Sequence, residues 1–156
     1  MALLTAAALI MFTVEAQLPA PVPIPGVKLG LANIITVWAM FALGPRDSLM
    51  VLLARILLGS MFSGAMSTLF YSLGGGLACW LVSCLLRKIL SERQIWVAGV
   101  IGAIAHNLGQ TGVAVLLYGS FAPAVYLPVL MLSGILTGLF TGLIAQLVYG
   151  RLQGRA

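Results

Sequence analysis

The side chains best suited to chemistry are a few polar groups set within long apolar stretches. His106 and Gln110 are four residues apart, so they would share one face of a helix, with Asn107 beside them. Glu15 and Arg55 are isolated charges in other apolar segments. Imidazole, amide, carboxylate and guanidinium groups bind small polar solutes through hydrogen bonds and charge pairing. Together they predict a solute-binding cavity rather than a catalytic centre.

The same residues could instead have structural roles that involve no solute. A Glu15–Arg55 pair would satisfy both charges without a ligand, and His106 could hydrogen-bond a backbone carbonyl. Charges at membrane depth cost ~2.5–3.5 kcal/mol each on insertion scales, so they usually face the bundle interior and pair there. The candidate substrate-binding residues are Glu15, Lys28, Asn33, Arg55, His106, Asn107 and Gln110.

The composition indicates that the apolar segments carrying these residues lie in a membrane. Of the 156 residues, 62% are hydrophobic and 7% are charged, and the mean hydropathy is +1.14. Because soluble domains carry about 25% charged residues, no soluble surface can be built from this chain. We therefore predict an all-α integral membrane protein with a single domain over residues 1–156.

Proline, glycine and charge clusters divide the chain into six apolar segments. A membrane-crossing helix needs ~20 mostly apolar residues, and the second and third segments are short for this purpose. The predicted transmembrane helices cover residues 2–18, 29–43, 48–63, 69–89, 95–118 and 125–149. Six crossings would place both termini on one side of the membrane.

Basic residues indicate which side that is. Those in or beside the exits of the even-numbered helices are Arg46, Arg87, Lys88, Arg93, Arg151 and Arg155. Since cytoplasmic loops carry an excess of Lys and Arg, we expect a multi-pass protein of the bacterial plasma membrane with both termini in the cytoplasm. The net charge of +5 reflects this asymmetry and does not indicate nucleic-acid binding, because aromatic residues do not interleave with the basic ones.

The first outer loop has proline at every second position, at Pro19, Pro21, Pro23 and Pro25, followed by Gly26. Each proline fixes φ and removes a hydrogen-bond donor, so the segment should be extended and stiff. It could be a rigid connector, or a gate loop that covers a pocket and is hinged at Gly26 and Gly30.

Small residues indicate two further packing surfaces. Ala2 and Ala6 form a small-xxx-small pair, and Gly134, Gly138 and Gly142 form a GxxxGxxxG ladder. Both patterns favour close contact between helices. The contact could lie within the monomer or with a partner subunit.

Motifs for catalysis and cofactor binding are missing from the sequence. It contains no Walker A or GxGxxG motif, and Asp47 is the sole aspartate among three acidic residues. Phosphate chemistry with Mg²⁺ needs a phosphate cradle or several carboxylates. The two cysteines, Cys79 and Cys84, form neither a redox CxxC pair nor a zinc site. We therefore expect no enzyme activity, no metal and no cofactor.

Two sequence blocks resemble those of a known group. They are KLGLAN at 28–33 and HNLGQ at 106–110, and with Arg55 and the Gly74-Gly75 pair they are similar to the Gx transporter family. This group is also labelled heptaprenyl diphosphate synthase component I, and the resemblance covers nearly the whole chain. It implies a relation to the substrate-binding S components of energy-coupling factor (ECF) transporters.

That relation implies a six-helix bundle like that of an S component, which binds a small vitamin-like solute near the outer face. It implies that the first outer loop acts as the gate. It also implies that an AxxxA surface on the first helix, here Ala2 and Ala6, contacts a transmembrane coupling subunit served by ATPases.

The favoured hypothesis is therefore a substrate-binding subunit of an ECF-type uptake transporter, which should have a closed pocket beneath the proline loop. One alternative is a non-catalytic membrane subunit of isoprenoid or quinone metabolism, which should have a groove open to lipid. The other is a structural subunit of a larger membrane complex, which should have no cavity. The identity of the solute does not follow from the sequence.

Overall fold

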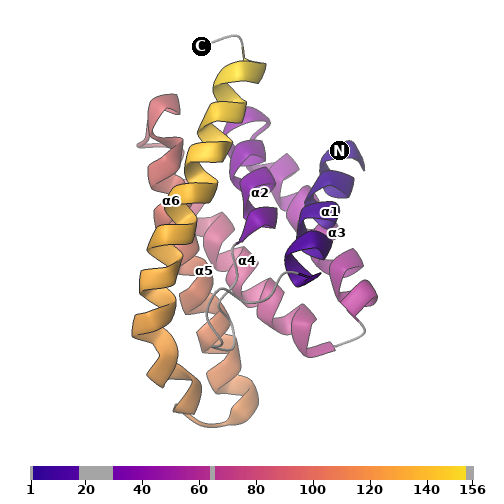
Figure 1. Ribbon diagram of the computed structural model, residues 1–156, viewed down its shortest axis with the longest axis vertical. Coiled ribbons are helices and arrows are strands. Elements are labelled where there is room, and N and C mark those ends of the chain that lie inside the picture. Colours follow the sequence, from indigo (N-terminus) through magenta and orange to yellow (C-terminus); the bar gives the residue numbers. More distant parts are fainter. Residues whose placement is uncertain (1, 18–29, 64–65, 154–156) are drawn as a thin grey trace.

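The computed structural model describes residues 2–17, 30–63 and 66–153, and within these ranges the chain forms helices joined by short turns, with no strand. The helices are α1 (Ala2–Gln17), α2 (Leu31–Ala42), α3 (Pro45–Ser63), α4 (Met66–Leu86), α5 (Ile95–Tyr118) and α6 (Leu127–Leu152) (Figure 1). Two 3-10 turns, η1 (Glu92–Gln94) and η2 (Ala122–Tyr126), lead into α5 and α6. The all-α prediction is confirmed for these ranges. Each predicted helix begins and ends within three residues of the observed helix.

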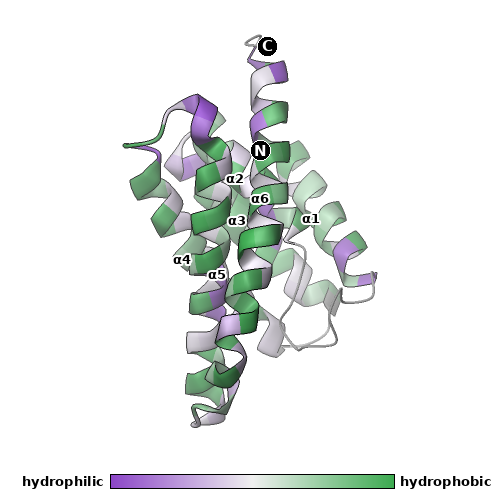
Figure 2. Ribbon diagram, turned by 60° about the vertical axis from the view of Figure 1, so that its left-hand side comes forward, coloured by the Kyte–Doolittle hydropathy of each residue, from purple (hydrophilic) through white to green (hydrophobic). Residues whose placement is uncertain are grey.

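Three segments are long and apolar enough to cross a membrane: Ser67–Leu86, Glu92–Tyr118 and Ala122–Leu152. The helices α1 and α2 are apolar but have only 16 and 12 residues. The charged residues of α3 interrupt its apolar surface. Hydrophobic residues cover the sides of the long helices, whereas hydrophilic ones gather towards the ends of α4 and α6 (Figure 2). The helical bundle is thus suited to a membrane, while six complete crossings stay a prediction.

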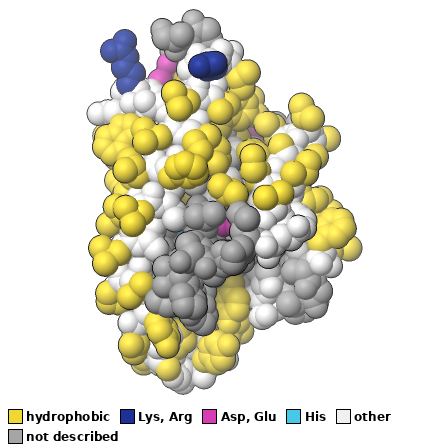
Figure 3. All heavy atoms as spheres, viewed as in Figure 1, with side chains coloured by type: hydrophobic (Ala, Val, Ile, Leu, Met, Phe, Trp, Pro, Cys, Tyr) yellow, Lys and Arg dark blue, Asp and Glu magenta, His cyan; other side chains and the backbone are white. Residues whose placement is uncertain are grey.

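The exits of the even-numbered helices lie at one end of the bundle. A Cβ added at Gly44, in the turn between α2 and α3, would lie 3.4 Å from Nη1 of Arg87 at the end of α4. Near the end of α6, Gln146 accepts a 3.3 Å hydrogen bond from the backbone N–H of Trp96 at the start of α5. Lys and Arg side chains are visible at this end of the molecule, which we call the basic end (Figure 3).

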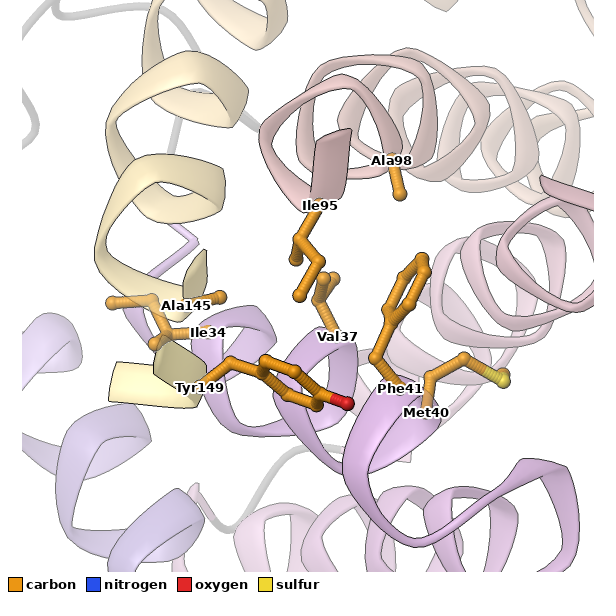
Figure 4. Packing of buried hydrophobic residues seen from close by; sticks show 8 residues of the cluster. All are labelled: Ile34, Val37, Met40, Phe41, Ile95, Ala98, Ala145 and Tyr149. Carbon is orange, nitrogen blue, oxygen red and sulfur yellow. The ribbon is translucent and has the colours of Figure 1, made fainter. Parts of the chain in front are cut away.

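The helix α2 is short and central. Seven of its 12 residues are buried, and α1, α3, α5 and α6 all pack against it. The apolar core is a cluster made by α2, α5 and α6: Ile34, Val37, Met40, Phe41, Ile95, Ala98, Ala145 and Tyr149 (Figure 4). Since α5 begins and α6 ends at the basic end, this core occupies that part of the bundle.

The glycine ladder of α6 packs against α5 inside the monomer. A Cβ added at Gly99 would lie 2.5 Å from Cα of Gly142, and one added at Gly138 would lie 2.8 Å from Cβ of Ala103. The two helices can be this close only because side chains are absent along the ladder. Of the two open interpretations of the GxxxGxxxG pattern, the structure therefore supports packing within the monomer.

The small-xxx-small pair on α1 lies at the surface of the bundle rather than inside it. Ala2 and Ala6 are both exposed on α1. Their side chains are therefore free to meet another molecule, and the partner contact predicted for them stays a prediction.

Candidate functional site

A polar cavity of about 120 Å³ lies inside the bundle, and all six α-helices contribute to its wall. It gathers six of the seven predicted substrate-binding residues: Glu15, Asn33, Arg55, His106, Asn107 and Gln110. The seventh, Lys28, lies outside the described residues, as does the predicted gate loop with Pro19, Pro21, Pro23, Pro25 and Gly26. The sequence thus identified residues that lie far apart along the chain but share one cavity.

The carboxylate of Glu15 holds the start of α2. The N–H of Gly30 donates to its Oε1 at 2.5 Å, and the N–H of Leu31 donates to its Oε2 at 3.1 Å. Gly30 has a φ of 71°, in the left-handed region that glycine adopts without strain. The first N–H groups of a helix lack partners within the helix, so a carboxylate from α1 satisfies donors that would otherwise be unpaired. Glu15 therefore has a structural role at the edge of the cavity.

Arg55 is shielded from lipid, as its position in an apolar helix predicted. Its side chain is only 7% exposed, and its Nε has no hydrogen-bond partner among the described residues. Glu15 attracts the guanidinium electrostatically, but the hydrogen bonds described for Glu15 go to the backbone of α2. The expected Glu15–Arg55 pairing is therefore present as an electrostatic attraction, and a direct contact between the two side chains stays a prediction. A buried donor without a partner is rare in proteins, and an acceptor on a bound molecule would satisfy it.

His106 lies against a glycine of α4. A Cβ added at Gly75 would approach three atoms of the imidazole ring to between 2.7 and 2.9 Å, so the ring fills the space that a side chain would need. The adjacent glycines face other elements: a Cβ at Gly74 would meet Val113 of α5, and one at Gly76 would meet Ile56 of α3. Only the middle glycine of the triplet therefore shapes the site.

Asn107 joins α5 to α6 as well as lining the cavity. Its Nδ2 donates to the backbone carbonyl of Leu130 at 2.5 Å. Gly134 leaves the necessary room, because a Cβ there would lie 2.6 Å from Nδ2. The amide nitrogen is therefore engaged by the backbone of α6, while the residue also forms part of the cavity wall.

Several polar wall residues were missed by the sequence analysis: Thr68, Tyr71, Ser72, Thr137 and Thr141. The last two are i,i+4 neighbours on α6, and their hydroxyls donate to backbone carbonyls of their own helix at 2.9 and 3.3 Å. Their spacing beside the glycine ladder was the available indication that they face α5.

The arrangement is suited to binding a compact polar group. Its wall combines guanidinium, amide and hydroxyl donors with carboxylate and amide acceptors around a small volume. Within residues 2–17, 30–63 and 66–153, no three His, Cys, Asp or Glu side chains are close enough to hold a metal ion.

Comparison with known proteins assigns the chain to a family. Residues 4–148 match the family model described as heptaprenyl diphosphate synthase component I. No match was found among curated proteins or among solved structures. Because the matched region spans nearly the entire chain, the protein belongs to the heptaprenyl diphosphate synthase component I family.

Proposed function

We propose that the chain is the membrane-embedded substrate-binding subunit of an ECF-type uptake transporter for a small metabolite. In this proposal six helices cross the plasma membrane, both termini are cytoplasmic, and the proline loop acts as the gate. The protein binds its solute without chemical change. The observation that carries the proposal is the internal polar cavity with a buried Arg55 whose Nε has no hydrogen-bond partner among the described residues.

The energetic argument concerns the cost of this arginine. A charged side chain within the membrane costs ~2.5–3.5 kcal/mol on insertion scales and usually has a partner or a functional role. Here the Glu15 carboxylate, which attracts the guanidinium, already accepts from the amides at the start of α2, and Nε of Arg55 has no hydrogen-bond partner in the part of the chain that the structure describes. A solute that brings an acceptor would offset this cost, which favours a binding site over a purely structural subunit.

The exposed surface of α1 supports the choice of a transporter subunit. Ala2 and Ala6 present small side chains on an exposed face, and Leu3 beside them is 83% exposed. Small residues allow a second helix to approach closely. We propose that this face docks a transmembrane coupling subunit served by ATPases.

Native mass spectrometry of the protein released from mild detergent tests solute binding. The wild type should carry a small bound mass, and Arg55→Met should lose it. Leu57→Met is the matched control, since Leu57 is 55% exposed on the same helix. The proposal predicts that Arg55→Met changes the free energy of unfolding of the ligand-free protein little.

Two results would contradict the proposal. A bound mass retained by Arg55→Met would show that the arginine does not contact the solute. A loss of about 3–5 kcal/mol in the ligand-free variant would show that Arg55 belongs to a buried structural pair.

The family description favours a second candidate function, a non-catalytic membrane subunit of isoprenoid or quinone metabolism. The word "component" in that description implies a second protein that works with this one. Affinity purification from native membranes separates the two hypotheses: a coupling subunit with ATPases should accompany a transporter subunit, and a prenyl diphosphate synthase should accompany the alternative.

A further inference from the structure

A second hollow, of about 590 Å³, lies at the end of the bundle opposite the basic end. Its wall includes the tyrosines Tyr71 of α4, Tyr118 of α5 and Tyr126 of η2, together with Ala114 and Leu130. We call it the tyrosine hollow. Tyr118 is 71% exposed and Tyr126 is 47% exposed, so the hollow reaches the molecular surface.

The tyrosine hollow adjoins the polar cavity. Tyr71 and Gln110 line both spaces. Leu130, whose carbonyl accepts the hydrogen bond of Asn107, is also part of the hollow's wall. The two spaces therefore lie side by side and share Tyr71 and Gln110 as part of their walls.

The two spaces differ in size and chemistry. The cavity of about 120 Å³ is small for a binding site, since pockets for whole ligands are usually about 300–1,000 Å³. It suits a compact polar group and little more. The hollow is larger, and tyrosine rings with Ala114 and Leu130 offer the apolar surface on which an aromatic or aliphatic body packs.

The charges around the cavity indicate the sign of the polar group. The side chains of Arg55 and Glu15 carry opposite charges, and the start of α2 adds roughly half a positive charge at the Glu15 carboxylate. The balance is positive, and Nε of Arg55 has no acceptor within residues 2–17, 30–63 and 66–153. An anionic oxygen group matches both features.

From this geometry we infer that the ligand is an amphiphilic carboxylate. Its carboxylate lies in the polar cavity beside Arg55, and its aromatic or aliphatic body lies in the tyrosine hollow. The inference rests on the proposed function in one respect, namely that the cavity binds a solute, and it adds the chemical class of that solute.

Binding of model compounds to the full-length protein in lipid nanodiscs tests the inference by isothermal titration calorimetry. The probes are propanoate, the phenyl-substituted acids from phenylacetate to 5-phenylpentanoate, and the uncharged 4-phenylbutan-1-ol. At least one phenyl acid should bind tenfold or more tightly than both propanoate and the alcohol. The best chain length then measures the distance from the cavity to the hollow.

Variants assign the two halves of the probe to the two spaces. Ala114→Trp fills the hollow and should reduce the advantage of the phenyl acid over propanoate to less than about twofold. Leu116→Trp is the matched control, because Leu116 lies on the same helix, is 82% exposed and is outside the hollow. Ala122→Trp fills the hollow from η2 and replaces Ala114→Trp if that variant does not fold. Arg55→Met should remove the advantage of the acid over the alcohol.

Several results would overturn the inference. If propanoate binds as tightly as every phenyl acid, the ligand occupies the cavity alone. If the alcohol equals the acid and Arg55→Met has no effect, the hollow is an independent apolar groove. If no probe binds while the wild type carries a native bound mass, the ligand class is wrong but the proposed function stands. If neither a probe nor a native mass is found, both fail.

Discussion

Alanine substitutions at single glycines of α5 test whether close helix packing shapes the cavity. Gly99 faces the backbone of α6, whereas a Cβ at Gly112 would have no neighbouring atom within 4 Å. The same chemical change therefore meets a fixed obstacle at one position and open space at the other. We expect Gly99→Ala to destabilise the protein and Gly112→Ala to leave it as stable or more so.

The magnitudes follow from the distances. At Gly99 the added Cβ would lie 2.5 Å from Cα of Gly142, so the two helices must separate by about 0.9 Å to reach ordinary contact at 3.4 Å. Overpacking of this kind costs about 1–3 kcal/mol, while alanine gains up to about 1 kcal/mol of helix propensity over glycine. We expect a net loss of about 1–2 kcal/mol, which corresponds to a fall of roughly 2–8 °C in Tm. Gly112→Ala should gain up to about 1 kcal/mol.

Gly75→Ala completes the series, because its added Cβ would meet the ring of His106 rather than a backbone. A side chain can rotate away where a backbone cannot. The expected loss of stability is therefore smaller than at Gly99, about 1 kcal/mol or less. The imidazole must leave its place in the cavity, so the native bound mass should be lost.

Thermal unfolding in detergent with a thiol-reactive fluorophore measures all three variants in a Cys84→Ser background, because Cys84 is partly exposed whereas Cys79 is 3% exposed and is shielded from the fluorophore in the folded protein. Native mass spectrometry of the same samples reports the bound mass. The reasoning is refuted if Gly99→Ala melts at or above the temperature of Gly112→Ala. It is also refuted if Gly75→Ala keeps the bound mass of the wild type.

Three further predictions concern Glu15, Asn107 and the orientation of the bundle. Glu15→Gln should lower the free energy of unfolding by about 1–2 kcal/mol, because a neutral amide replaces a carboxylate that accepts two backbone hydrogen bonds; thermal unfolding checks this. Asn107→Ala should lower the free energy of unfolding by about 0.6 kcal/mol, and by not more than about 1.7 kcal/mol, as is usual for side-chain hydrogen bonds between membrane helices. An unchanged Tm would contradict this prediction. In a variant without native cysteines, Ser120→Cys should react with an impermeant maleimide in intact cells and Ser91→Cys should not, and the reverse pattern would invert the orientation.

The helices were predictable because proline, glycine and charge interrupt the apolar segments where the helices end. The bounds of α5 were predicted to the residue, since it follows the charged segment around Glu92 and ends at Gly119, whose φ of 60° suits a helix end. The bounds of α3 were less accurate. It begins at Pro45, three residues before the prediction, because a proline at the first position of a helix lacks an N–H that would have no partner there.

The candidate site was partly predictable for a related reason. A histidine, an arginine or a pair of amides in an apolar helix has no place facing lipid, so each of them points to an interior cavity. Thr137, Thr141 and Ser72 escaped notice because hydroxyl side chains are tolerated in membrane helices, where they can bond to the backbone. The role of Glu15 could not be predicted, because its partners are backbone amides and no side-chain pattern marks them.

The position of the cavity follows from the length of α2. A helix of 12 residues covers about 18 Å, against roughly 30 Å for the hydrocarbon core of a bilayer. In the proposed membrane arrangement α2 ends at the basic end of the bundle and therefore begins well inside the bilayer, where Gly30 and Asn33 line the cavity. A helix that begins at this depth exposes its first N–H groups and the positive end of its dipole where water is scarce, so it requires an anionic partner. Glu15 meets this requirement for two amides, and Arg55, which Glu15 attracts, adds a positive charge whose Nε has no partner among the residues that the structure describes. Secondary transporters place broken helices at the same depth to bind anionic groups of their substrates. This part of the bundle is more suitable for a captured anion than for a static structural contact, because it combines a short second helix, a carboxylate at the start of that helix and a buried arginine.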